Sequence, residues 1–467
     1  MSVTAPPASP SIDATPQLVA RLRAGFESGR TRPVEWRLAQ LGRLRALLTE
    51  NTDALVRALE IDLRKPDPEG FATDVSFTIG DIDLARKQLR RWMKPRRVGT
   101  PLKLQPGRSW LVPEPLGVVL VIAPWNYPVQ LALAPLAAAI AAGNCALVKP
   151  SEVTPHVSAA IAELLPRYLD PECYAAVEGG VAETQALLAE RWDHIFYTGN
   201  GRVGRIVMEA AAKHLTPVTL ELGGKSPCLV DEDVDLDVAA RRIVWGKFLN
   251  CGQTCVAPDY VLVHAAREQE LVERMGHYVR QFYGDEPQQS RDLARIVNEQ
   301  HVDRLEKLLE SGTPAVGGRV DRADRYVAPT ILRDVSPGSP AMQEEIFGPI
   351  LPVLPVRDME EAIGFVNARP KPLALYVFTR RQAVEDAVLA RTSAGGVTVN
   401  AAIWHLGNPN LPFGGVGESG MGAYHGKHGF DAMSHYKPVL KKSTRSDPSI
   451  GYPPYTKWKK ALIKRFA

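Results

Sequence analysis

The sequence predicts an α/β protein with two doubly wound, parallel-sheet domains, and three observations lead to this fold class. First, VVLVI at residues 118–122 is a continuous apolar run, typical of a strand buried on both faces. Second, strand and helix patterns alternate from this run to residue 222. Third, the alternation continues more loosely after residue 222. Sustained alternation of this kind is characteristic of parallel sheets covered by helices.

The elements follow one another in a simple order. Residues 16–96 are predicted to be helical, because their apolar residues recur at spacings of three and four. Five predicted strands with helices between them then build the first sheet: GVVLVIAP, CALVKP, YAAVEGG, HIFYTG and PVTLEL. The second region begins with GGKSPCLV, repeats the pattern through YVLVHAA, GFVNARP, LALYVFT and GGVTVN, and ends in the glycine-rich segment LPFGGVGESGMGAYHGKHG.

Charge and cysteine content narrow the class of protein. The net charge is +4 and basic residues are interspersed with acidic ones, so no nucleic-acid partner is expected. Five cysteines are too few for a disulfide framework and favour a reducing, cytoplasmic location. The start of the chain has no secretory signal pattern. The basic tail KWKKALIKRFA is interpreted as docked or solvated rather than membrane-bound, because one short segment binds lipid weakly.

Two cysteines lie four positions apart in LNCGQTCVAP, residues 249–258. No metal site is expected, because zinc needs four ligands and Cys251 and Cys255 have no second pair nearby. The spacing also differs from the C-x-x-C of thioredoxin-type sites. Two interpretations stay open: a packing cysteine, or a nucleophile in which Cys255 lies near a helix N-terminus whose N–H groups stabilise a thiolate.

Polar residues follow or end predicted strands elsewhere in the chain. Asn126 in APWNYP comes directly after the strand at 118–122, and Glu221 in LELGGKSP lies near the end of another strand. EEIFGPI, residues 344–350, places an acidic pair before a loop. Because the carboxyl ends of parallel strands form the usual site in open α/β folds, Asn126 and Glu221 are expected at one edge.

These four stretches, in this order, resemble the aldehyde dehydrogenase superfamily from about residue 20 to residue 455. AAAKHLTPVTLELGGKSPC and GQTCVAPDYVL look like its class 3 branch, the fatty and aromatic aldehyde dehydrogenases. The resemblance implies an aldehyde dehydrogenase-like fold with an NAD-binding domain at 1–98 and 118–218 and a catalytic domain at 219–428. It also implies a small β oligomerisation element at 99–117 and 429–450, followed by the basic tail at 451–467.

The resemblance further implies the catalytic residues. Cys255 would be the nucleophile that forms a thiohemiacetal and then a thioester. The Asn126 amide and the Cys255 backbone N–H would form the oxyanion hole. Glu221 would activate the hydrolytic water as a partly buried base with a raised pKa.

The cofactor implied is NAD, with NADP as an alternative. GNGRVG at 199–204 matches G-x-G-x-x-G, but a Rossmann interpretation would assign Glu221 to the ribose, against its role as base. The family pattern instead places Lys149 and Glu152 at the adenosine ribose, and Glu345 and Phe347 at the nicotinamide ribose. The pyrophosphate would lie at a helix N-terminus beside Gly199, Asn200, Gly201, Arg202, Val203 and Gly204. Gly201 departs from the family pattern.

The expected partners are a medium- or long-chain aliphatic or aromatic aldehyde and a second copy of the chain, forming a homodimer. Two other functions stay open at this stage: a thiol hydrolase or acyltransferase that uses Cys255 with a histidine, and a non-catalytic binding member of the family. A CoA-acylating relative is a third alternative, although that type generally lacks a base equivalent to Glu221.

Overall fold

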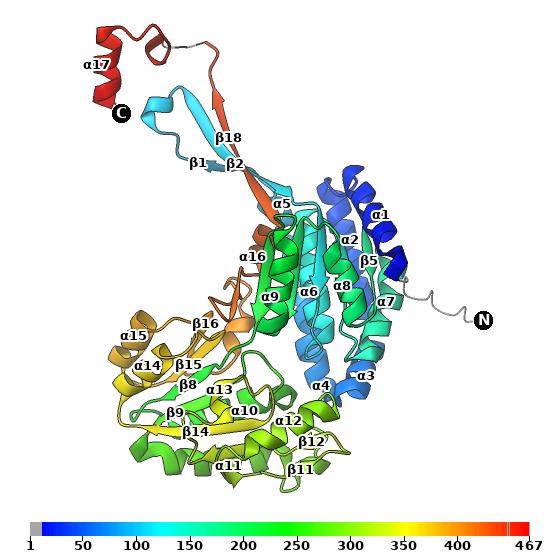
Figure 1. Ribbon diagram of the computed structural model, residues 1–467, viewed down its shortest axis with the longest axis vertical. Helices are drawn as coiled ribbons and strands as arrows, with labels where there is room; N and C mark the ends of the chain where they lie inside the picture. The colour runs from blue at the N-terminus through cyan, green and yellow to red at the C-terminus, as the bar shows by residue number, and fades with distance from the viewer. Residues whose placement is uncertain (1–11, 446, 448, 467) are drawn as a thin grey trace, which may run out of the picture.

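The structure, a computed structural model, describes residues 12–445, 447 and 449–466. Its first sheet has six strands in the order β17-β7-β6-β3-β4-β5 (Figure 1). The five predicted strands are confirmed as its parallel strands, and only β17 runs antiparallel, against β7. The strands are β3 (Val118–Ile122), β4 (Cys145–Lys149), β5 (Tyr174–Ala176), β6 (His194–Gly199), β7 (Val218–Leu222) and β17 (Gly420–Met421).

Helices from two parts of the chain pack around this sheet (Figure 1). The region predicted to be helical contains five of them, with a π-helical turn at Phe71–Ser76 between the fourth and fifth. These are α1 (Thr15–Glu27), α2 (Val34–Glu50), α3 (Thr52–Leu63), α4 (Asp67–Gly70) and α5 (Phe77–Trp92). The helices between the strands are α6 (Pro128–Ala142), α7 (Pro155–Tyr168), α8 (Val181–Ala189) and α9 (Gly201–Ala212).

The second sheet has seven strands in the order β10-β13-β14-β9-β8-β15-β16 and is parallel except for β10. Its strands are β8 (Pro227–Val230), β9 (Tyr260–His264), β10 (Thr313–Val316), β13 (Thr330–Arg333), β14 (Ile350–Val356), β15 (Ala374–Phe378) and β16 (Gly396–Val399). Its helices are α10 (Leu236–Phe248), α11 (Glu268–Tyr283), α12 (Glu299–Leu309), α13 (Pro340–Gln343), α14 (Met359–Asn367) and α15 (Gln382–Arg391). Strands β11 (Val320–Asp321) and β12 (Tyr326–Val327) pair with each other as a separate antiparallel ribbon.

The division of the chain differs from the expected one at two points. The boundary expected at residue 219 falls inside β7, because this strand pairs with β6 in the first sheet. Residues 420–421 return to the same sheet as β17, and α16 (Gly426–Ala432) packs against α5 and α6. Strand β17 and helix α16 therefore belong to the first unit, although the sequence analysis assigned them to the catalytic domain and the bridging element.

A third, three-stranded sheet projects from the body as an arm (Figure 1). It contains β1 (Arg96–Val98), β2 (Gly107–Pro115) and β18 (Ser434–Lys442), all antiparallel. Helix α17 (Lys457–Phe466) follows at its far end. None of the helices in the described part of the chain combines the length and apolar character needed to cross a bilayer.

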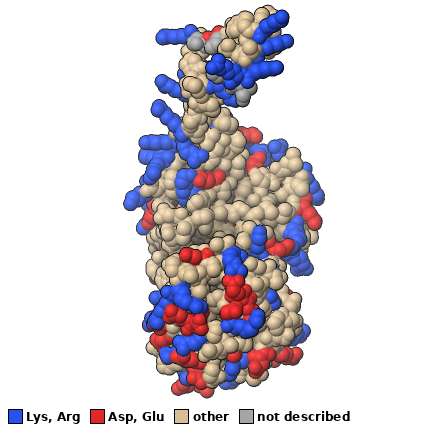
Figure 2. All heavy atoms as spheres, turned by 90° about the vertical axis from the view of Figure 1, so that its left-hand side faces the viewer, with Lys and Arg blue, Asp and Glu red and all other residues tan. Residues whose placement is uncertain are grey.

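The arm carries an unusual share of the positive charge. Residues 94–115 and 434–466 include 14 Lys and Arg but only two acidic residues, which leaves 42 basic and 50 acidic residues in the rest of the chain. Figure 2 shows these basic side chains gathered over the arm. The expectation that basic and acidic residues are interspersed is therefore wrong for this element, because the fold brings together two segments that lie far apart in the sequence.

Candidate active site

Twelve of the thirteen predicted site residues line one cavity of about 960 Å³. It lies between the two large units, since its lining includes strand ends of the first sheet and loops of the second. The exception is Gly204, which is buried against Leu222; a Cβ on this glycine would lie 3.0 Å from Leu222 Cδ2. Gly204 therefore allows α9 to pack on β7, and it does not line the cavity.

Cys255 lies in the loop between α10 and β9. Asn250 and Cys251 have positive φ angles of 51° and 54°, and Gly252 has a φ of 73°. A Cβ on Gly252 would lie 2.3 Å from the Gly348 carbonyl oxygen, so only glycine allows this approach. The chain then enters a turn before β9, and no helix begins there. The expected helix N-terminus at Cys255 is wrong, because α10 precedes this loop rather than follows it.

The thiol of Cys255 is half-buried and is shifted toward its protonated form. Burial raises its pKa most, and the charges of Glu345 and Glu221 raise it further. Hydrogen bonds from the backbone N–H groups of Cys255 and Val256 act in the opposite direction. The balance of these effects favours the thiol over the thiolate.

Asn126 lies in the loop after β3, directly opposite the cysteine loop. Its side chain is buried, and its Nδ2 donates to the Gln253 carbonyl oxygen at 3.0 Å. The amide is thus held against a residue two positions before Cys255. Since an amide nitrogen has two N–H groups, one donor is left for a ligand in the cavity.

Glu221 is the penultimate residue of β7 and is only 2% exposed. Neither carboxylate oxygen has a hydrogen-bond partner among the described residues. Burial raises the pKa of this carboxyl well above its ordinary value, because no donor stabilises the charge. An unpartnered, buried carboxyl that lines the same cavity as a thiol is suited to accept a proton near neutral pH.

Another part of the cavity lining combines a charged pair with a helix N-terminus. Lys149 Nζ lies 2.5 Å from Glu152 Oε2, and the Glu152 side chain is 47% exposed. Asn200 caps α9 by accepting from the Val203 N–H at 3.0 Å. Arg202 is exposed in the first turn of this helix. An anionic group is favoured at such a helix end, beside a cation.

The loop after α13 closes another side of the cavity. The Glu345 carboxylate lies so close to Gly223 that a Cβ there would be 1.8 Å from Oε2. Burial, helped by Asp259, raises the pKa of Glu345 to about 8. Phe347 has a φ of 47° and meets the Trp125 ring edge-on, with ring centroids 5.2 Å apart.

Two cavity residues on α12 were not predicted. Arg304 donates to the backbone carbonyls of Glu345 at 3.4 Å and Ile346 at 2.5 Å, so it holds the loop that carries Glu345. His301 lies against Trp125, with ring centroids 5.2 Å apart. Their segment, NEQHVDRLEKLL, has only the ordinary pattern of an amphipathic helix. No signal in the sequence could have marked these two residues.

No group of three or more His, Cys, Asp or Glu side chains within the described ranges is arranged to hold a metal ion. All five cysteines lie in these ranges and are unpaired. The chemistry of the cavity therefore rests on a thiol, an amide, buried carboxyls and an anion-binding helix end.

Comparison with known proteins identifies the family. The profile of the aldehyde dehydrogenase family matches residues 10–439. The chain belongs to the aldehyde dehydrogenase family. A mouse protein named aldehyde dehydrogenase family 3 member A2 is 51% identical over 450 residues, covering 96% of this chain and 93% of the relative. Mouse aldehyde dehydrogenase, dimeric NADP-preferring, is 50% identical over 439 residues, covering 94% and 97%.

Solved aldehyde dehydrogenases share the fold. A substrate-bound AldH from Staphylococcus aureus superposes with a TM-score of 0.94 at 45% identity, covering 97% of this chain and 99% of that one. An indole-3-acetaldehyde dehydrogenase in complex with NAD⁺ superposes with a TM-score of 0.86 at 27% identity, covering 93% and 90%. The predicted class 3-like branch and the predicted fold are thus confirmed. This aldehyde dehydrogenase is an oxidoreductase that oxidises aldehydes and depends on NAD, with NADP as an alternative.

Proposed function

We propose that Cys255, Asn126 and Glu221 oxidise an aldehyde to its carboxylate through a covalent acyl-enzyme. The observation that supports this proposal is that all three residues line one cavity, in which the buried Glu221 carboxyl has no hydrogen-bond partner among the described residues. We also propose that the six-stranded unit holds the dinucleotide and that the seven-stranded unit carries the nucleophile.

In the first step, Cys255 Sγ adds to the aldehyde carbon. The cavity is open to solvent, so the thiol proton leaves to water. The carbonyl oxygen becomes an anion that accepts hydrogen bonds from Asn126 Nδ2 and the Cys255 backbone N–H. NAD⁺, when bound, would supply the hydride acceptor needed to oxidise this adduct to a thioester.

In the second step, Glu221 takes a proton from a water molecule that attacks the thioester carbon. The carbon–sulfur bond breaks, the Cys255 thiolate leaves, and the carboxylate product forms. The Asn126 amide stabilises the oxyanion again. One aldehyde, one NAD⁺ and one water yield one carboxylate, one NADH and two protons.

The cavity residues fit a dinucleotide. The pyrophosphate anion would lie at the N-terminus of α9 beside Gly201 and Arg202. Lys149 and Glu152 would hold the adenosine ribose, and Glu345 with Phe347 would hold the nicotinamide ribose.

We propose medium- or long-chain aliphatic or aromatic aldehydes as substrates. Trp404 is 63% exposed and stacks on Trp245 at 5.5 Å between centroids. The Tyr376 hydroxyl donates at 2.5 Å to the carbonyl of Val256, next to Cys255, and its ring lies 6.2 Å from that of His405, the residue after Trp404.

Initial rates of NADH formation with aldehydes of two to sixteen carbons, and with aromatic aldehydes, test this function. We expect kcat/KM to rise with chain length, since each buried methylene contributes about 0.8 kcal/mol. Highest activity with the shortest aldehydes would contradict the substrate class. Absence of NADH, together with hydrolysis of thioesters or esters, would favour the thiol hydrolase or acyltransferase.

Replacing Glu152 should change the choice of cofactor. We expect NAD⁺ to be preferred, because the Glu152 carboxylate binds ribose hydroxyls and repels a 2′-phosphate. Glu152→Gln should raise the NADP⁺-to-NAD⁺ ratio of kcat/KM by about tenfold, which corresponds to about 1.4 kcal/mol. Glu163→Gln, an exposed carboxyl paired with Arg167 on α7, is the matched control. An unchanged ratio in Glu152→Gln would contradict the ribose assignment.

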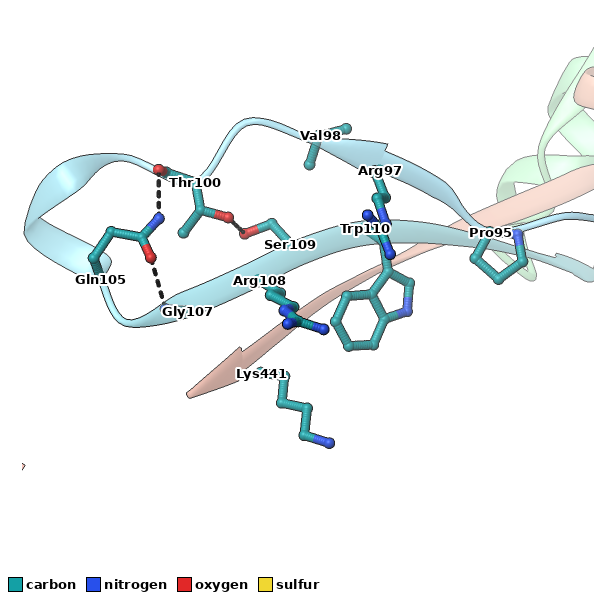
Figure 3. A pocket seen from close by; sticks show the side chains of 10 residues that line it. All are labelled: Pro95, Arg97, Val98, Thr100, Gln105, Gly107, Arg108, Ser109, Trp110 and Lys441. Carbon is teal, nitrogen blue, oxygen red and sulfur yellow. Dashed lines mark hydrogen bonds between the residues drawn. The ribbon is translucent and has the colours of Figure 1, made fainter. Parts of the chain in front are cut away.

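We propose that two copies form a homodimer through the arm. The arm exposes several large apolar side chains, including Leu102 at 87% and Leu440 at 47%. It also holds a hollow of about 610 Å³ in which Arg97, Arg108 and Lys441 lie near Trp110 (Figure 3). The basic arm complements the excess of acidic residues in the rest of the chain. Sedimentation equilibrium should give twice the mass of one chain, and a single-chain mass would contradict the proposal.

We propose a cytoplasmic location on the basis of the five unpaired cysteines.

A further inference from the structure

Lys65 is a fully buried lysine directly behind the proposed oxyanion hole. Its side chain has no solvent exposure, and its Nζ donates to the Asn126 carbonyl oxygen at 3.0 Å. The same Nζ lies 2.9 Å from Asp74 Oδ2, in an ion pair that is also fully buried. Burying two charges is costly unless the geometry satisfies both, so such a pair holds its surroundings in one arrangement.

Asp74 fixes the other side of the same loop. Its second oxygen, Oδ1, accepts from the backbone N–H of Val129 at 3.1 Å and of Gln130 at 3.3 Å. These N–H groups belong to the first turn of α6, which begins at Pro128. The Lys65–Asp74 pair therefore fixes the Asn126 loop at two points. Lys65 binds the Asn126 carbonyl, and Asp74 binds the first turn of α6, which follows this loop.

The cysteine loop is attached to the same peptide. Asn250 Nδ2 donates to the Asn126 carbonyl at 2.8 Å and to the Gln253 carbonyl at 3.1 Å. Lys65 Nζ also lies 4.1 Å from the centre of the Tyr127 ring, whose hydroxyl is 2.6 Å from Thr254 Oγ1. Lys65 thus contacts Asn126 and Tyr127, the two neighbouring residues whose side chains bind Gln253 and Thr254 in the loop of Cys255.

We infer that Lys65, with Asp74, is the positioning residue for the Asn126 amide. It does not line the cavity and acts through the Asn126 backbone. This inference rests on the proposed function, because it requires Asn126 to stabilise the oxyanion. Without the ammonium group, the Asn126 carbonyl loses one of two donors, Asp74 keeps an unpaired buried charge, and the amide no longer keeps its fixed direction.

The test is a double-mutant cycle read as the rate constant of the NADH burst. Lys65→Met should slow the burst by about 10²-fold, the loss typical of one oxyanion donor. Asn126→Ala should slow it by a similar factor. In the Asn126→Ala background, Lys65→Met should cause no further change, because its effect passes through Asn126. The dissociation constant of NAD⁺, measured by fluorescence titration, should stay within about twofold of the wild type.

Arg37→Met is the matched control. Arg37 is also a buried cation that donates to backbone carbonyls, at the opposite end of α6, to Ala141 at 3.1 Å and Ala142 at 2.7 Å. It should lower thermal stability while leaving the burst rate constant unchanged. If Lys65→Met does not fold, Asp74→Asn takes its place in the cycle, since it removes the charge and keeps the shape.

The possible results are distinct. A non-additive cycle supports the positioning role of Lys65. Additive effects, or an unchanged burst in Lys65→Met, overturn it. Absence of an aldehyde-dependent burst in the wild-type enzyme would instead be a failure of the proposed function.

Discussion

Cys255→Ala abolishes aldehyde-dependent NADH formation, and we expect the loss to be at least about 10⁴-fold, as for nucleophiles of other covalent enzymes. The reason is that no other cysteine lines the cavity. NAD⁺ binding should persist, because Cys255 is not among the residues proposed to hold the dinucleotide. Stopped-flow absorbance measures the turnover, and equilibrium dialysis measures NAD⁺ binding.

Cys251→Ala is the control for this result. Cys251 is buried within the same loop and, unlike Cys255, does not line the cavity. It should therefore be out of reach of an aldehyde in the cavity. If Cys251→Ala lost activity as severely as Cys255→Ala, the thiol at 255 could not be identified as the single nucleophile.

Glu221→Gln separates the two halves of the reaction. We expect a burst of about one NADH per active site to persist while steady-state turnover falls by about 10²- to 10⁴-fold, the typical contribution of a general base. The burst should survive because the Glu221 charge raises the pKa of Cys255, so its removal does not hinder ionisation of the thiol. Rapid-mixing absorbance records both phases in one experiment.

The pH dependence of the deacylation rate is a second test of Glu221 as the general base. Glu221 must be unprotonated to take a proton from water, and burial raises its pKa well above the ordinary value. The deacylation rate should therefore fall with decreasing pH at a higher pH than for an exposed glutamate. Glu221→Gln should remove this dependence, whereas Glu209→Gln, exposed on α9, should keep it. A Glu221→Gln enzyme without a burst would contradict the base assignment.

The sequence predicted most of the framework because its signals were local. The strand at 118–122 is apolar at every position, and the structure buries all five residues. By contrast, ILPVLPV became β14 although Pro352 and Pro355 argue against a strand. Its parallel pairing with β13 and β9 is a tertiary contact that no local pattern reveals.

The candidate site shows the same limit. Strand ends marked Asn126 and Glu221 as candidates, because they form the functional edge of a parallel sheet, and the resemblance to aldehyde dehydrogenases supplied their roles. Lys65 was not found, because LEIDLRKP looks like the end of an ordinary helix, and its contact with Asn126 spans 61 positions. The helix expected at Cys255 is absent for a similar reason. The loop that replaces it depends on the close approach of Gly252 to the Gly348 carbonyl, a contact between distant parts of the sequence.

The pairing of β17 with β7 has a consequence for biosynthesis. Gly420 lies opposite Glu221, so the edge of the first sheet is completed by residues made almost 200 positions later. On the ribosome, the nascent first unit exposes an unpaired strand edge until most of the chain has emerged, and such edges promote aggregation. The two large units must therefore reach their native state as one cooperative whole, and an excised N-terminal fragment would lack its last strand.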